Sequence, residues 1–158
     1  MSTFIRLLVL VILLNVVRYL AGIPLEQLYT LPRLSAEMEA HASYFKTDFT
    51  TFDWVTSYLY NFMLWLTTTW VYHKMHPALA GVHLLKSLKV YGLMYLMFAS
   101  ISFIYMNHYS HPKWFYIYNV MDCFIAFAVV AIANGLLYPL VFRQKKTAPV
   151  ETEVAPTT

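Results

Sequence analysis

From Trp114 to Phe142 the chain is almost uninterruptedly apolar, and one carboxylate, Asp122, lies inside this run. At a helical rise of about 1.5 Å per residue, the run is long enough to cross a hydrocarbon core of roughly 30 Å. Asp122 would then lie about 12 Å below the membrane surface, where a charged side chain costs at least ~2.5 kcal/mol. A chain keeps such a residue where a neighbour pairs with it or a reaction uses it.

The composition is that of a membrane protein. Of the 158 residues, 59% are hydrophobic and 12% are charged, whereas soluble domains carry roughly 25% charged residues. We therefore expect one all-α integral membrane domain over residues 1–143 and a flexible cytoplasmic tail over residues 144–158. The net charge of +3 is small, and we expect no nucleic-acid partner. Cys123 is the single cysteine, which excludes an intramolecular disulfide and a thiolate zinc site.

Four apolar runs predict a four-helix transmembrane bundle, with helices over about residues 4–21, 54–73, 88–107 and 114–138. Between the first two helices, residues 22–52 contain Pro24 and Pro32 and an amphipathic pattern after Ser35. This pattern predicts a short extracytoplasmic segment that lies on the membrane surface or against the bundle. It is either an ordered connection or a docking platform.

The first run has two interpretations. Arg6 precedes a short apolar core that ends at the small residues Ala21 and Gly22, and this order is also typical of a secretory signal peptide. We interpret the run as an uncleaved anchor helix.

Basic residues indicate the orientation of the bundle. With both termini in the cytoplasm, the inner side holds Arg6, Lys74, Lys86, Lys89, Arg143, Lys145 and Lys146. Arg33, Lys46 and Lys113 then lie outside, and this bias follows the positive-inside rule. The sequence predicts a protein of the bacterial inner (plasma) membrane with cytoplasmic N and C termini.

Polar residues recur at a similar depth in all four predicted helices. We expect them to meet in one layer inside the bundle, where each satisfies groups that lipid cannot. The layer consists of Asn15, Asn61, Ser100, Asn119 and Asp122. Arg18 lies near the same depth, and its side chain either extends to the lipid headgroups or forms an ion pair with Asp122.

The last helix has two faces suited to close packing. Ala131 and Gly135 form a small-xxx-small pair next to Ala128, opposite the polar arc that contains Asp122. Gly92 gives the third helix a small-residue face as well. One packing face suffices in an isolated bundle, so the second predicts contact with another chain or with a tightly crossed neighbour.

Catalytic and metal signatures are absent from the sequence. None of the six histidines lies at the centre of a predicted helix, whereas a transmembrane haem needs two at matched depth on facing helices. No HExxH, GxSxG or phosphate-binding glycine loop occurs. We assign no catalytic residue, no metal ligand and no cofactor, although a quinone, haem or pigment among the aromatic residues stays open.

Three functions are compatible with these observations. The first is a non-catalytic accessory or scaffold subunit of a larger integral membrane complex, which packs on other membrane subunits through the last helix and on lipid elsewhere. The second is a small homo-oligomeric transporter or proton-coupled channel centred on Asp122. The third is a quinone-, haem- or pigment-binding membrane subunit. A lipid-modifying enzyme is a fourth alternative.

Overall fold

The computed structural model describes residues 2–46 and 48–142, which form helices, connecting turns and no strand. Three segments are long and apolar enough to cross a membrane: Thr3–Tyr29, His83–His108 and Lys113–Val141. They identify the chain as a membrane protein. The other long helix, α4 (Thr51–Met75), is less apolar because it carries Asp53, Asn61 and three consecutive threonines. The expected cytoplasmic tail over residues 144–158, with Lys145 and Lys146, lies outside the described part, as does Arg143.

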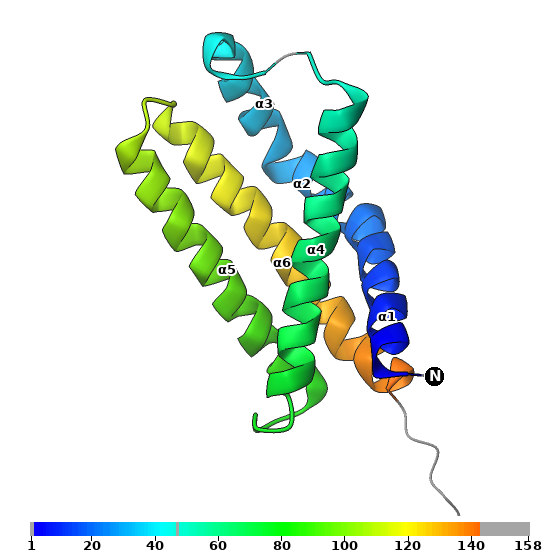
Figure 1. Ribbon diagram of the computed structural model, residues 1–158. Helices are drawn as coiled ribbons and strands as arrows, with labels where there is room; N and C mark the ends of the chain where they lie inside the picture. Colours follow the sequence, from blue (N-terminus) through cyan, green and yellow to red (C-terminus); the bar gives the residue numbers. More distant parts are fainter. Residues whose placement is uncertain (1, 47, 143–158) are drawn as a thin grey trace, which may run out of the picture.

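Helix α6 (Lys113–Val141) is the central element of the fold. It packs along α5 (His83–His108) on one side and along α1 (Thr3–Val17) on another (Figure 1). It is also the helix with the most buried side chains, among them Val130, Ala131 and Asn134. Both of its packing faces therefore contact helices of this chain.

The first apolar segment is bent. After α1 the backbone makes a π-helical turn at Arg18–Gly22 and continues as α2 (Ile23–Tyr29) and α3 (Leu31–Ala40). In Figure 1, α1 ends part-way along the bundle, and α3 rises towards the end where α4 begins. A π-helical turn loosens the backbone hydrogen-bond ladder, and such turns are frequent at functional sites.

The helix expected at residues 4–21 thus continues beyond its predicted end. Pro24 and Pro32 were expected to lie in a loop. Pro32 instead lies in the first turn of α3, where its missing N–H has no intrahelical partner to lose, and Pro24 directly follows the π-helical turn on a continuous helical path. Helices α2 and α3 both pack against α6. The predicted surface segment over residues 22–52 is therefore partly a component of the bundle. Beyond α3, a short 3₁₀ turn over Ala42–Tyr44 leads towards α4.

Helix α4 packs well only in its second half. Thr50 caps its start, and Thr50 and Asp53 exchange the reciprocal hydrogen bonds of a capping box. No residue from Thr51 to Leu64 is buried, whereas Trp65, Thr68, Thr69 and Tyr72 all are. The N-terminal half of α4 stands away from α5 in Figure 1.

Helix α5 begins earlier than the predicted residue 88 because Gly81 turns the chain sharply at a φ of 107°, which favours glycine. Helix α6 runs past the predicted residue 138 to Val141. Pro139 lies within its last turn.

Candidate functional site

A buried ion pair lies at the bend of the first segment. Nη2 of Arg18, in the π-helical turn, is 2.9 Å and 3.0 Å from the two carboxylate oxygens of Glu26 in α2. Glu26 is only 2% exposed, and the Arg18 side chain is 15% exposed. A Cβ on Gly22 would come within 3.2 Å of the Arg18 guanidinium, so the absence of a side chain there leaves room for the arginine to fold back.

A second acidic group lies next to this pair. Asp122 of α6 accepts a hydrogen bond from the hydroxyl of Thr30, and Thr30 is itself 1% exposed. Thr30 lies between α2 and α3, so this bond ties the bend to the central helix. The cluster of Arg18, Glu26, Thr30 and Asp122 combines two carboxylates with one guanidinium.

Of the two alternatives for Arg18, the ion pair with Asp122 is not formed among the described residues. Arg18 instead pairs with Glu26, which lies eight residues later on the same bent segment. Glu26 and Thr30 were missed because Pro24 suggested that the membrane helix had ended. Their signal was that apolar residues continue around them, at Ile23, Leu25 and Leu28.

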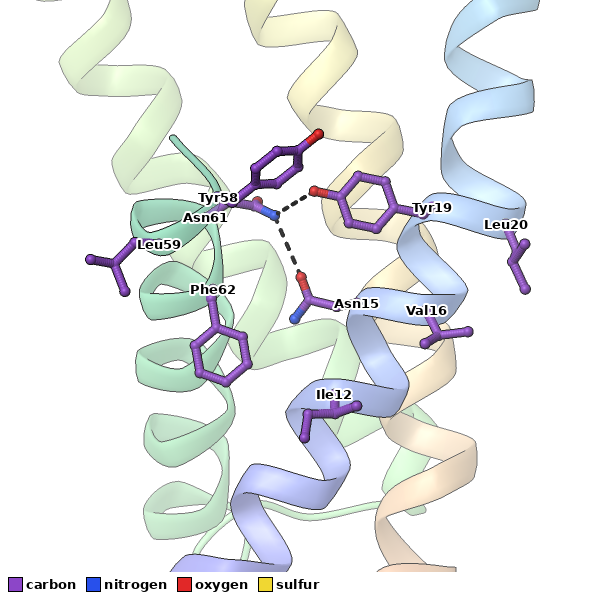
Figure 2. Close-up of a pocket in the computed structure, with 9 residues that line it drawn as sticks. All are labelled: Ile12, Asn15, Val16, Tyr19, Leu20, Tyr58, Leu59, Asn61 and Phe62. Carbon is purple, nitrogen blue, oxygen red and sulfur yellow. Dashed lines mark hydrogen bonds between the residues drawn. The ribbon is translucent and has the colours of Figure 1, made fainter. Parts of the chain in front are cut away.

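A separate polar group joins α1 to α4. The Asn61 amide donates to Oδ1 of Asn15 at 3.5 Å and to the hydroxyl of Tyr19 at 3.4 Å, so both bonds are long (Figure 2). These residues line a groove of about 620 Å³ whose remaining walls are mostly apolar. The other lining residues are Ile12, Val16, Leu20, Tyr58, Leu59 and Phe62.

The expected polar layer therefore divides. Asn15 and Asn61 meet at the groove, and Asp122 belongs to the cluster around Arg18. Ser100 is exposed and donates to the carbonyl of Leu96 in its own helix, which satisfies the hydroxyl without a partner helix. Asn119 is half-buried and makes no side-chain hydrogen bond to residues 2–46 or 48–142.

The small residues expected to let another helix approach closely are mainly used between α5 and α6. Ser87 of α5 donates to the carbonyl of Ala131 at 2.7 Å, and Gly135 lies against the backbone of Leu84. Gly92 and Ala128 line a small cavity of about 170 Å³ between the same two helices.

Three histidines gather at the opposite end of the bundle from α3. The ring centroids of His73 and His76 lie 5.9 Å apart, and those of His76 and His83 lie 6.0 Å apart. The hydroxyl of Tyr138 in α6 forms a hydrogen bond of 2.8 Å with Nδ1 of His73. The buried Tyr72 hydroxyl contacts Nδ1 of His83 at 3.1 Å. Within the described part of the chain, no three metal-ligating side chains are placed to hold one ion. The contacts observed here join α4, α5 and α6.

Comparisons with protein-family models, with curated proteins and with solved structures give no match to this chain. Its function must therefore be inferred from its own residues.

Proposed function

We propose that the chain is a non-catalytic accessory subunit of a larger integral membrane complex. In this proposal α4 also crosses the membrane, which makes a four-helix bundle, and both termini lie in the cytoplasm of a bacterial cell. The observation that carries the proposal is the N-terminal half of α4, from Thr51 to Leu64, in which no residue is buried.

The outward face of α4 is where we place the partner. Tyr60 is 73% exposed, and Thr67, seven residues or two turns later, is exposed on the same face. Buried Trp65 points towards the bundle instead. Polar groups on a membrane helix favour association with other helices, because lipid tails offer them no hydrogen bonds. A transmembrane helix from a second subunit would cover this face.

This assignment moves the partner surface away from α6. The sequence pattern favoured the last helix because it has two packing faces, and α1 and α5 fill both. Helix α4 is the long helix that combines lower hydropathy with weak packing in its first half. Those two properties support a partner on α4.

Cysteine crosslinking in native membranes tests the proposal. Tyr60→Cys, in a Cys123→Ala background, should form one crosslinked product of fixed stoichiometry with another membrane protein. The matched control is Leu96→Cys, because Leu96 is 60% exposed on α5, away from the proposed surface. Crosslinking of both variants to the same mixture of proteins, or of neither variant to any protein, would contradict the proposal.

The cluster at the bend favours a second candidate function, proton-coupled transport. The buried ion pair of Arg18 and Glu26 lies beside a second carboxylate, Asp122, and intramembrane acids commonly serve proton pathways. In proteoliposomes with an internal pH dye, Asp122→Asn should abolish proton entry if the cluster conducts. Proton entry that is absent from the unmodified protein, or unchanged in Asp122→Asn, argues against this function.

A further inference from the structure

We infer that the groove between α1 and α4 binds a polyprenyl quinone. The ligand class is a neutral, flat ring with carbonyl acceptors and an apolar isoprenoid tail. The groove's volume of about 620 Å³ falls within the ~300–1,000 Å³ of small-molecule sites. This surface differs from the outward face of α4, so the inference does not depend on an accessory-subunit function.

The polar end of the groove has more hydrogen-bond donors than the protein has acceptors there. The Asn61 amide is shared between two long hydrogen bonds, to Asn15 and Tyr19. The hydroxyls of Tyr19 and Tyr58 donate to no residue in the described ranges, 2–46 and 48–142. Figure 2 shows the Tyr19 hydroxyl directed at Asn61 beside the ring of Tyr58. A ligand carbonyl would give these donors the acceptor that lipid tails lack.

The depth of this polar end selects a quinone over a phospholipid. Counted from the start of each predicted span, Asn15 lies about 16 Å of helical rise from residue 4, and Asn61 lies about 10 Å from residue 54. In a hydrocarbon core of roughly 30 Å, both amides are then about 10 Å or more from either surface. Phospholipid ester carbonyls belong to the interface, whereas a quinone ring carries its carbonyls on an entirely apolar tail.

Aromatic and aliphatic walls fit the two parts of such a ligand. The rings of Tyr19 and Tyr58 lie 6.4 Å apart and at 60°, and Trp54 stacks on Tyr58 at 6.4 Å. These rings provide flat surfaces beside the amide of Asn61. Ile12, about one turn before Asn15, and Val16, next to it, present an apolar wall for a tail.

Binding of decylubiquinone tests the inference. The full chain is reconstituted in lipid nanodiscs, and tryptophan fluorescence is followed during the titration, because Trp54 stacks directly on a groove residue. We expect saturable quenching and at least a tenfold weaker Kd in Asn61→Leu, which removes the donor. Tyr60→Phe, on the outward face of α4, is the matched control and should bind like the unmodified protein.

Two further arms keep the result decisive. Tyr58→Phe removes one hydroxyl while keeping the ring, and it replaces Asn61→Leu if that variant proves unstable. We expect a smaller, roughly threefold weakening of the Kd in Tyr58→Phe. Dodecylbenzene, which has an apolar tail and a ring without carbonyls, should not compete with decylubiquinone. Equal binding by Asn61→Leu and the unmodified protein, or full competition by dodecylbenzene, would overturn the inference and leave a groove that holds only lipid tails.

Discussion

Gly135 of α6 lies so close to Leu84 of α5 that a Cβ on residue 135 would come within 2.6 Å of the Leu84 Cα. The nearest atom belongs to the backbone, which cannot rotate away as a side chain would. The close approach also brings Ser87 within hydrogen-bond distance of the Ala131 carbonyl, one turn before Gly135. The helix pair α5 and α6 therefore depends on a residue without a side chain.

Gly135→Ala should lower the free energy of unfolding by about 1–3 kcal/mol, because the helices must separate to admit the methyl group. The measurement is reversible unfolding in mixed micelles titrated with SDS. Gly92→Ala is the control, since a Cβ there meets nothing within 4 Å. That variant should be neutral or stabilised by about 0.5–1 kcal/mol, the helical preference of alanine over glycine. Equal effects at both glycines would contradict the role given to Gly135.

Ser87→Ala should cost about 1–3 kcal/mol of unfolding free energy. Ser87 is buried, and its hydroxyl accepts from the Asn134 amide at 2.9 Å, so the variant leaves a buried donor unpaired. Ser100→Ala should change stability by less than about 0.5 kcal/mol, because Ser100 is exposed. The same micelle titration compares the two serines on one helix, and a larger loss at Ser100 would be inconsistent with the structure.

Arg18→Leu should be strongly destabilising, by about 3–5 kcal/mol, because it leaves the carboxylate of Glu26 buried without its partner. The double variant Arg18→Leu with Glu26→Leu should recover most of that loss, since no charge stays behind. A double-mutant cycle on unfolding free energies measures the coupling. Additive losses in the double variant would show that the two side chains do not interact.

The start of α4 should loosen in acid. Hydrogen bonds from Lys46 and then from Thr50 hold the pKa of Asp53 well below its usual value of about 3.9. The cap is therefore intact above about pH 4 and is lost as the pH falls from there towards the lower folded-state value. Hydrogen-exchange protection factors in the first turn of α4 should follow this curve. In Asp53→Asn they should be low and should not vary between pH 7 and pH 3.

The sequence was sufficient to predict three helices long and apolar enough to cross a membrane, because hydropathy depends on composition alone. Asn15 and Asn61, two amides of the expected polar layer, lie within hydrogen-bond distance of each other. The hydrogen bond from Thr30 to Asp122 could not be predicted, because it joins residues 92 positions apart. Such a contact depends on how α2 and α3 return to α6.

The bend at Arg18 could not be predicted from local sequence patterns, for a different reason. Prolines both end helices and begin them, and Pro24 follows an uninterrupted helical path whose π-helical turn has no sequence signature. The two packing faces of α6 were visible in its small residues, but the pattern does not say whose helix fills them. Neighbouring segments of the same chain did so.

The pairing of Arg18 with Glu26 also bears on the order in which the protein is made. The two residues are eight positions apart on one continuous segment, so their charges can neutralise each other before any later helix has been synthesised. The first segment can then enter the bilayer without a net charge in its apolar part. The partner of Asp122 in the described structure is Thr30, which lies 92 positions earlier and is therefore already in the membrane when the last helix is made. The first segment would thus act as the template on which the last helix docks.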